Sequence, residues 1–507
     1  MSKVFRNWLV PLVSILMLIV ISVLFWQFTV DDSYISFRYA QNLADGFGIV
    51  FNPGERVEGY SNFLWILILS LFAGMGFDLV VTAKVLGVLF SAATLLVLWK
   101  AGLWLNKGQV DRITHIAPIL CASNAAYGAW GIGGLEPPLF SFLITCSVLR
   151  LLQERTNGSR FPWSGLLLGL TAIARPEGIL FTFLWMAVVA GSQIRNPRNL
   201  RPSLYGSLRL FFSLSLFGVY LAWRFWYYGH WLPNTFYAKT GGGLNQIRDG
   251  LVYAGSFFLN NGIIFLPLLV LAALRSYDRD RTEPLWLIFF LVIGYMGFVV
   301  IAGGDWMPLY RLFVPILPLF FLLVQEAVRL VLDIAPSYPW VRTGLVLTLI
   351  AVVPLTLFQA ARFQKYLLLE QVNFECSVID WLEENAPPKA SIALQLAGAI
   401  PFYTRLYTID RMGLLDPHIS RLPGGLHHKQ DEQYILNRKP TFIQIFAKND
   451  PRKFAYDSIF VGDRVLWSMP EFHRDYRMVF LCGNEKAPNP NRYLLLFQRR
   501  QLEPANS

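Results

Sequence analysis

Residues 8–30 read WLVPLVSILMLIVISVLFWQFTV, an apolar run of 23 residues that Asp31 and Asp32 follow directly. About 20 such residues are enough to cross the hydrocarbon core of a bilayer as a helix. Lys3 and Arg6 precede the run, which is longer than the core of a secretory signal peptide and has no small-residue cleavage site after it. We therefore expect a retained membrane helix that enters the bilayer from the cytoplasm.

The composition of the whole chain agrees with this start. Of 507 residues, 54% are hydrophobic and 15% are charged, against about 25% charged in an ordinary soluble domain. The mean hydropathy is +0.43. These values exclude a soluble enzyme, a disordered protein and a fibrous one, and they favour a polytopic membrane protein. The net charge of +11 comes from short loops between apolar spans, so it does not indicate nucleic-acid binding.

The positions of the basic residues predict which loops face the cytoplasm. The stretch Phe63–Phe77 is apolar but only 15 residues long. If it lies on or dips into the outer face, the inner loops hold 15 Lys and Arg and the outer loops before residue 362 hold 7. We therefore expect 11 spanning helices, an inner N-terminus, and outer segments at 31–79 and 362–507. The ten further spans are expected at 80–99, 113–130, 137–153, 162–174, 177–193, 206–228, 251–274, 284–302, 309–333 and 341–361.

The chain turns polar from Arg362 onward, which predicts a second domain. Residues 1–361 form the expected transmembrane domain, and residues 362–507 form an extracytoplasmic domain with strands alternating with helices, typical of a small α/β layer. Cys376 and Cys482 both fall in this domain, and the sequence leaves open whether they pair. Strands are expected at 390–396, 406–410, 441–446, 478–482 and 493–498, and helices at 378–385 and 397–404.

The acidic pair Asp31-Asp32 opens a polar loop that reads DDSYISFRYAQNLADGFGIVFNPGERVEGYSNFLW, residues 31–65. Its glycines and proline are turn formers, so the loop is expected to be folded. An Asp at such a place often caps the next helix, and residues 33–45 have a helical pattern. Two adjacent carboxylates at a membrane surface can also raise one another's pKa, which suits a general base. Glu58 lies later in the same loop.

Two short motifs with charged residues follow at expected outer helix ends. Glu136 lies in GGLEPPLF, residues 133–140, where an acidic first turn of a Pro-started helix explains it better than a direct role. Arg175 and Glu177 lie in ARPEG, residues 174–178, which is either a hairpin with an internal ion pair or part of a site. An outward-facing Arg goes against the topological bias, so we favour the site slightly.

Two outer segments combine aromatic, amide and charged residues. They read YYGHWLPNTFYAK, residues 227–239, and GGDWMPLYR, residues 303–311. Aromatic belts at the membrane surface account for some of the Trp and Tyr. Rings with neighbouring amides and carboxylates also suit sugar binding, and Lys or Arg suits a phosphate. The candidate substrate-binding residues here are Asn234, Tyr237, Lys239, Asp305, Trp306 and Arg311.

These motifs together resemble a known class of protein. An acidic pair in the first outer loop, many spans and an outer C-terminal domain resemble the GT-C membrane glycosyltransferases, which use polyprenyl-phosphate sugars. The loop 31–65, with ARPEG, PNTFYAK and GGDWMPLYR, is similar to the branch that includes the mycobacterial terminal β-1,2-arabinofuranosyltransferase and other bacterial relatives. The resemblance continues in the tail at IDRMGLLDPHI, residues 409–419, and HHKQDEQYIL, residues 427–436.

The resemblance implies a mechanism. A sugar, for example a pentofuranose such as arabinofuranose, would pass with inversion from a polyprenyl phosphate to a cell-envelope glycan or glycoconjugate, outside a bacterial cytoplasmic membrane. Asp31 or Asp32 would take the acceptor proton. Arg311, Lys239 and Arg175 would hold the leaving phosphate, and acids such as Glu58 or Asp305 would stabilise positive character at the sugar. The implied partners are the lipid-linked donor, the glycan acceptor and membrane lipid; metal use varies in this class, and no metal-ligand cluster in the sequence indicates one.

Two other classes use the same hydrophobic composition. A transporter of lipid-linked or small solutes would carry charged residues near the bilayer midplane and symmetric halves, but the polar motifs lie mostly at one face and no half-repeat is visible. A non-catalytic envelope assembly factor with the same fold differs from an enzyme only in an activity assay.

Overall fold

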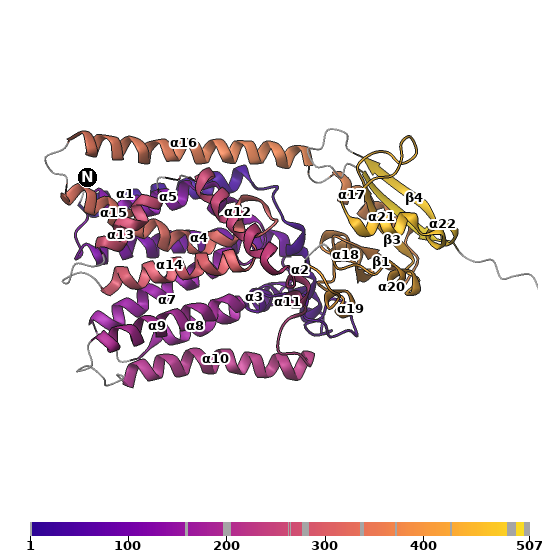
Figure 1. The fold of residues 1–507 in the computed structure, drawn as a ribbon, viewed down its shortest axis with the longest axis horizontal. Coiled ribbons are helices and arrows are strands. Elements are labelled where there is room, and N and C mark those ends of the chain that lie inside the picture. Colours follow the sequence, from indigo (N-terminus) through magenta and orange to yellow (C-terminus); the bar gives the residue numbers. More distant parts are fainter. Residues whose placement is uncertain are drawn as a thin grey trace, which may run out of the picture.

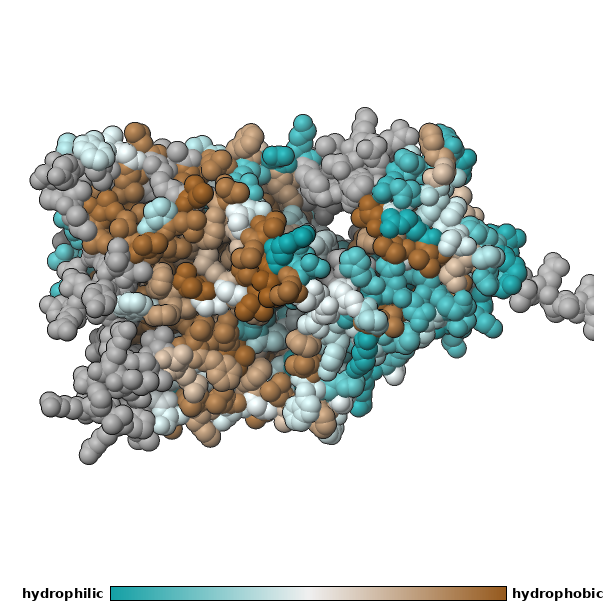
Figure 2. All heavy atoms as spheres, in the orientation of Figure 1, coloured by the Kyte–Doolittle hydropathy of each residue, from teal (hydrophilic) through white to brown (hydrophobic). Residues whose placement is uncertain are grey.

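A computed structural model of the chain shows a bundle of helices with a small α/β layer at one end (Figure 1). It describes residues 3–157, 161–195, 204–261, 263, 265–275, 283–334, 339–370, 373–425, 428–483 and 493–500. Helix α16 (Pro339–Glu370) runs along one side of the bundle, and α10 (Leu204–Tyr228) along the opposite side. Brown, apolar side chains cover the bundle and teal, polar ones the α/β layer, as expected for a membrane domain with a water-facing domain (Figure 2).

Three helices in the described part of the chain are long and apolar enough to cross a membrane: Leu79–Leu105, Gly206–Tyr228 and Pro308–Asp333. The number rises to five if two bent helix pairs are each counted as one span. The count of 11 spans therefore stays a prediction. The other bundle helices are α1 (Lys3–Leu24), α5 (Ile116–Ser123), α6 (Ala125–Ile132), α7 (Pro137–Asn157), α8 (Trp163–Ala174), α9 (Ile179–Arg195), α12 (Gly243–Asn261), α13 (Phe265–Arg275) and α14 (Glu283–Ile301).

Two stretches expected to be single spans are broken. The stretch 113–130 is divided at Asn124, whose side chain accepts from the Tyr127 amide and caps α6. The stretch 251–274 is divided between α12 and α13, which are bent by 101°. Asn124 also donates to Asn261 at the end of α12, with 3.2 Å between Nδ2 and Oδ1. A polar pair in an apolar bundle thus joins the two breaks, because each amide needs a partner there.

Helix α3 (Phe63–Gly74) has only 12 residues, and both of its ends lie at one end of the bundle. Before it, Asn62 bonds to Ser36 and Glu136. After it, Lys84 in the first turns of α4 (Leu79–Leu105) donates to the carbonyls of Trp26 and Phe28, just beyond α1. This path agrees with a segment that dips into one face of the bundle.

Ion pairs mark the opposite end of the bundle. Glu154 near the end of α7 accepts from Arg209 at the start of α10 and from Ser164 at the start of α8. Arg329 near the end of α15 (Leu317–Ile334) pairs with Asp111, in the connection that holds Asn106. The connection 106–112 therefore lies away from the α/β layer.

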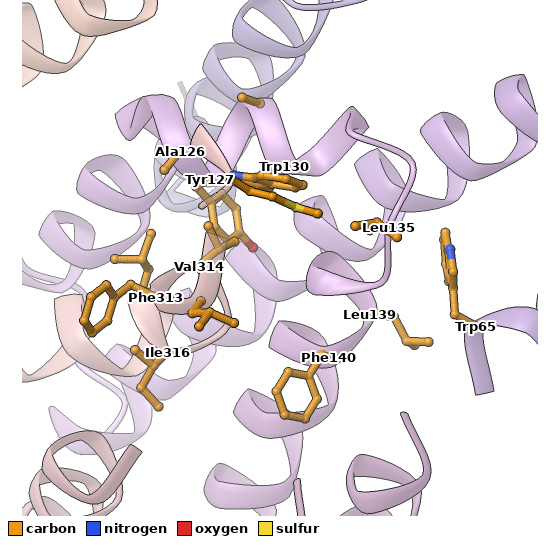
Figure 3. Close-up of a cluster of buried hydrophobic side chains, with 14 of the residues drawn as sticks. Trp65, Ala126, Tyr127, Trp130, Leu135, Leu139, Phe140, Phe313, Val314 and Ile316 are labelled. Carbon is orange, nitrogen blue, oxygen red and sulfur yellow. The ribbon is translucent and has the colours of Figure 1, made fainter. Parts of the chain in front are cut away.

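The buried core of the bundle packs against the segment 308–316, which contains the candidate site residue Arg311. Figure 3 shows side chains of this core from α3, α6, α7 and η4 (Pro308–Ile316). Trp65 and Trp130 are fully buried, and their ring N–H groups donate to the carbonyls of Gly134 and Pro308 at 3.0 and 3.1 Å. Burying one such side chain stabilises the fold by about 1.5–3 kcal/mol. The aromatic core thus holds η4 against α6.

The α/β layer contains one five-stranded sheet in the order β2-β1-β3-β5-β4. β1, β2 and β3 run parallel, and β5 is antiparallel to β3 and β4. Each strand was expected within two residues of its observed ends, since alternation and β-branched content are local signals. The strands are β1 (Ser391–Leu394), β2 (Tyr407–Asp410), β3 (Phe442–Ala447), β4 (Tyr476–Gly483) and β5 (Tyr493–Arg499).

The two faces of the sheet have different neighbours. Ile392, Leu394 and Phe442 belong to the same buried cluster as the bundle core. Ile443 and Ile445, on the other face, form a separate core. The layer therefore packs directly against the membrane part and shares its buried core. Helix α16 also runs without a break through the expected domain boundary at 361/362. The tail helices are α17 (Asn373–Asn385), α18 (Ala399–Thr404), α19 (Pro417–Ser420), α20 (Glu432–Asn437), α21 (Val461–Ser468) and α22 (Pro470–Asp475).

Candidate active site

Asp31 and Asp32 both lie in the first turn of α2 (Asp31–Ala44), but their side chains point in different directions. Val30 holds the N-cap position of the helix and makes no side-chain capping hydrogen bond, so neither Asp31 nor Asp32 is the N-cap residue that the capping interpretation expected. Asp31 instead accepts from the amide of Ala399 in the tail, with 2.8 Å between Oδ1 and N. Successive residues of a helix point about 100° apart. Asp32 therefore points elsewhere, into a pocket.

Asp32 opens into a small cavity of about 50 Å³ at the end of the bundle. Its carboxylate has no hydrogen bond or ion pair with any described residue. Burial raises the pKa of Asp32; Lys239 and Arg311 oppose this shift, and Asp305 and Glu136 add to it. Burial is therefore the main cause of the raised pKa of Asp32, whereas the sequence had suggested repulsion from the adjacent Asp31 as the cause. The cavity is lined by Asp32, Ile35, Ser36, Gly59, Tyr60, Ser61, Asn62, Leu135, Glu136, Arg175, Thr235, Lys239, Arg311 and Leu414.

Arg175 connects the two motifs that the sequence left undecided. Its guanidinium donates to Glu177 within ARPEG and to Glu136 from the break before α7. The internal ion pair is therefore present, and its Arg175 also lines the small cavity. Glu136 is buried and accepts from Asn62 at 2.7 Å. Burial acts to raise the pKa of Glu136, but Arg175 and Arg311 outweigh it, so the pKa is lowered and the group stays ionised.

Arg311 follows a strained stretch of backbone. Leu309 and Tyr310 have φ values of 55° and 53°, the left-handed region that costs a non-glycine residue about 1–2 kcal/mol. The Arg311 guanidinium donates to Asp305, with 2.7 Å between Nε and Oδ2, and lies 5.7 Å from the centre of the Trp130 ring. The two left-handed residues turn the chain so that Arg311 faces the cavity while Phe313 enters the core. Such strain is typical of functional sites.

Lys239 is the cation at this site without a partner among the described residues. It ends α11 (Asn234–Lys239) and faces open space beside the cavity. Burial lowers the pKa of Lys239, and the nearby charge of Arg311 lowers it further, whereas Asp32 and Asp305 raise it. Among the described residues no carboxylate pairs with Lys239, so an anion could contact it without displacing an existing ion pair.

A large groove of about 1840 Å³ shares a wall with the small cavity. Ser61, Arg175, Thr235, Lys239 and Arg311 line both spaces. One part of the groove is apolar, with Phe217 and Leu221 from α10 and Phe298 and Ile301 from α14. Another part reaches the tail at Gly424, Gly425 and His428. The exposed rings of Trp231 and Trp306 also line it, so rings, cations and apolar helices meet in one space.

Two predicted substrate-binding residues, Glu58 and Asn234, have other contacts in the structure. Glu58 is buried and pairs with Arg224 at 2.9 Å, and burial raises its pKa to about 7 against the opposing effects of Arg224 and Tyr220. Asn234 donates to the carbonyls of Gly413 and Leu414, each at 2.9 Å.

Tyr237 and Trp306 lie in different surroundings. Tyr237 accepts at its carbonyl from Lys429, and the Arg421 guanidinium lies 5.0 Å from its ring. Trp306 is 54% exposed and lines the groove. Tyr237 therefore joins the tail to the bundle, and Trp306 is the aromatic residue of GGDWMPLYR that faces open space.

Sequence reasoning missed several residues of the site. Asn62, Ser61 and Leu414 carry no local signal, because loops far apart in the chain bring them together. Arg224 had a usable signal, since a charged residue inside an apolar stretch such as 206–228 is a functional candidate by default. In the described part of the chain, no group of three or more His, Cys, Asp or Glu residues is arranged to hold a metal ion.

Comparisons with known proteins agree with this architecture. A family described as "Domain of unknown function (DUF8728)" matches residues 363–496. No curated protein matches the chain. The crystal structure of ArnT from Cupriavidus metallidurans bound to undecaprenyl phosphate is similar with a TM-score of 0.55 and 12% identity, over 98% of each chain.

A second similar structure is an archaeal enzyme. The apo form of the Archaeoglobus fulgidus oligosaccharyltransferase has a TM-score of 0.55 and 12% identity, over 99% of this chain and 76% of that one. Its complex with Zn and sulfate has a TM-score of 0.53 and 13% identity, over 86% and 68%.

These likenesses define the class of fold. The chain has the GT-C fold of membrane glycosyltransferases, a bundle of apolar helices with a small C-terminal sheet domain, as the sequence predicted. The narrower branch that the motifs resemble, the number of spans and the domain boundary stay predictions.

Proposed function

We propose that this protein transfers a sugar from a polyprenyl-phosphate donor to a hydroxyl of a cell-envelope glycan or glycoconjugate, at the outer face of a bacterial cytoplasmic membrane. One observation carries the proposal: Asp32, a carboxylate without a partner among the described residues, faces a cavity that shares three cations with a groove between apolar helices. The fold supports it, since similar structures include a protein bound to undecaprenyl phosphate and an oligosaccharyltransferase.

The apolar part of the groove suits a lipid chain. Side chains of α10 and α14 line it, and both helices belong to the membrane part. A polyprenyl tail in this part would leave its phosphate near Lys239, Arg311 and Arg175. Lys239 is the first candidate for the phosphate because it has no carboxylate partner among the described residues, whereas Arg311 and Arg175 are held by acids. Those arginines retain further N–H groups with which to contact an anion.

Asp32 would act as the general base. An acceptor hydroxyl in the small cavity would give its proton to the Asp32 carboxylate as its oxygen bonds to the anomeric carbon. The bond from that carbon to the phosphate oxygen breaks in the same displacement, and the polyprenyl phosphate leaves with the electron pair. One displacement inverts the anomeric centre, and burial favours the base because a raised pKa makes proton uptake easier near neutral pH. Asp305 and Glu136 would stabilise positive charge at the sugar.

The sequence resemblance and the groove indicate a sugar and an acceptor. The sequence resemblance implies a pentofuranose such as arabinofuranose. The exposed rings of Trp231 and Trp306 in the groove offer faces for sugar stacking. A polymeric or lipid-linked acceptor would fit the size of the groove.

Purified protein in nanodiscs, with a synthetic polyprenyl-phosphate arabinofuranose and an arabinan-type acceptor, tests the proposal. We expect transfer that is lost in Asp32→Asn. A panel of other polyprenyl-phosphate sugars identifies the sugar, and glycan analysis of cells with and without the protein identifies the product. A protein that binds the donor but transfers none of these sugars to any envelope glycan would be an assembly factor. Movement of the donor between leaflets without transfer would indicate a transporter.

A further inference from the structure

The α/β layer contributes directly to the small cavity beside Asp32. Leu414, from the turn after β2, is part of the cavity wall. The amide of Ala399, at the start of α18, holds the carboxylate of Asp31 at 2.8 Å. Residues 31 and 399 are 368 positions apart, yet one contact joins the tail to the residue next to the candidate base.

The contact between Asp31 and α18 leaves no spare room. A Cβ atom added to Gly398 would lie 2.1 Å from the backbone oxygen of Asp31 and 2.3 Å from its Oδ1. Only a glycine allows the tail to approach this closely. The first turn of α2 is therefore packed against backbone of the tail.

The same turn is held from the bundle side. The amide of Val30 donates to Gly133 at 3.2 Å, and the hydroxyl of Ser33 donates to Val30 at 2.6 Å. Gly134 lies against Ser33 with no room for a side chain. Contacts on two sides fix the helix turn that carries Asp32, and the tail supplies one of them.

We infer that Asp31 is a positioning residue: its bond to Ala399 fixes the first turn of α2 and so directs the Asp32 carboxylate into the cavity, which makes the α/β layer a working part of the catalytic pocket. The inference rests on the proposed function, in which Asp32 is the base. It divides the roles of the acidic pair, because Asp31 serves as a hydrogen-bond acceptor and Asp32 as the proton acceptor.

A second contact from the tail supports this role. Asn234 donates to the carbonyls of Gly413 and Leu414, and its Oδ1 accepts from Ser420 at 2.8 Å. Asn234 begins the six-residue helix α11, which Lys239 ends. The turn that places Leu414 in the cavity wall therefore also fixes the helix that carries Lys239.

The two roles respond differently to substitution. An amide oxygen accepts from a backbone N–H much as a carboxylate does, so Asp31→Asn keeps the contact with Ala399. An amide does not take up a proton at neutral pH, so Asn does not replace a base. A side chain placed about 1 Å away from its productive position loses about 100-fold in rate.

The experiment compares Asp31→Asn, Asp31→Ala and Gly398→Ala in the full-length protein in nanodiscs, with kcat and the KM for the polyprenyl-phosphate donor as readouts. We expect Asp31→Asn to keep kcat within about threefold. Asp31→Ala and Gly398→Ala should lose about 10- to 100-fold in kcat, with the donor KM within twofold, since the cations are untouched. Gly218→Ala is the control, because a Cβ at Gly218 meets nothing within 4 Å.

The outcomes separate the inference from the function it rests on. Equal inactivity of Asp31→Asn and Asp31→Ala would overturn the inference and make Asp31 the proton acceptor. Normal kcat in both Asp31→Ala and Gly398→Ala would also overturn it. If one alanine variant fails to fold, the other and Asp31→Asn still decide. Normal turnover in Asp32→Asn would instead reject Asp32 as the base, whatever the Asp31 variants do.

Discussion

Nη1 of Arg38 lies 2.6 Å from the carbonyl oxygen of Pro401, so a guanidinium of the first loop donates into the α/β layer. Arg38 is 2% exposed and also donates to Leu406 and Phe51, at 2.9 and 2.8 Å. Burial, with the nearby charge of Arg405, lowers the pKa of Arg38 to about 9. The loop and the tail therefore form one folded unit at the end of the bundle.

Arg38→Met should destabilise this unit strongly. Met keeps the length of the stem but removes the Arg38 hydrogen bonds to the carbonyls of Pro401 and Leu406, and one of the two hydrogen bonds to the carbonyl of Phe51. Hydrogen bonds to charged groups contribute about 1.5–3 kcal/mol each, so we expect a loss of at least about 3 kcal/mol in the free energy of unfolding. Thermal unfolding and limited proteolysis of the tail measure it. Arg474→Met is the control, since the Arg474 side chain is 71% exposed and pairs only with Asp475 at the surface; equal melting of both variants would contradict the prediction.

Asp32→Asn should nearly abolish transfer while leaving the fold intact. Loss of a general base costs about 10²–10⁴ in rate. The wild-type rate should fall with decreasing pH as Asp32 takes up a proton. Because burial raises the pKa of Asp32 above its ordinary 3.8, that fall should occur at a higher pH than for a solvent-exposed Asp. A pH profile of kcat checks this; near-normal turnover of the variant would place the base elsewhere.

Lys239→Met should affect both donor binding and the pH profile. Removing one charge-assisted phosphate contact should raise the donor KM by about 10- to 100-fold. The positive charge of Lys239 also lowers the pKa of Asp32. Without it that pKa rises, so the acid limb of the profile moves to higher pH. Lys239→Arg keeps the charge and should keep the limb in place; a limb that stays in place in Lys239→Met would show that the two groups do not interact.

Gly87→Ala tests the packing of α4 against α6. A Cβ at Gly87 would lie 2.0 Å from the carbonyl oxygen of Gly131, a backbone atom that does not move alone. We expect destabilisation by about 1–3 kcal/mol, seen as a lower Tm in detergent. Gly344→Ala in α16 meets nothing within 4 Å and should be neutral or stabilising by up to about 1 kcal/mol. If Gly87→Ala and Gly344→Ala had the same Tm, the predicted close contact between Gly87 and Gly131 would be wrong.

The topology predicts opposite labelling of the two ends of the bundle. Gln109 is exposed in the connection that holds Asn106, and Gln433 is exposed in the tail. Gln433→Cys should react with a membrane-impermeant thiol reagent in intact spheroplasts, and Gln109→Cys only after the membrane is opened. The protein without either added cysteine gives the background labelling of the native cysteines. Labelling of Gln109→Cys from outside would reject the 11-span topology.

Local sequence patterns were enough to predict the class of fold and the position of most elements. Apolar runs, turn residues and alternation are local properties, so they predicted the strands of the tail, the short apolar stretch at 63–77 and the gathering of polar motifs at one end. They did not predict the breaks at Asn124 and after Asn261, because a single Asn in an apolar run is a weak local signal, and the hydrogen bond between Asn124 and Asn261 joins segments far apart in the sequence.

Contacts between distant segments determine which of the two adjacent acids faces the cavity. Asp31 and Asp32 are equivalent in a local pattern, and they differ because Ala399 lies beside one of them. Glu136 and Arg175 likewise became one cluster through packing across 39 positions of sequence. Contacts of this kind depend on how distant segments dock, and the free energy that sets the docking comes from the whole core, so no short stretch of sequence contains it.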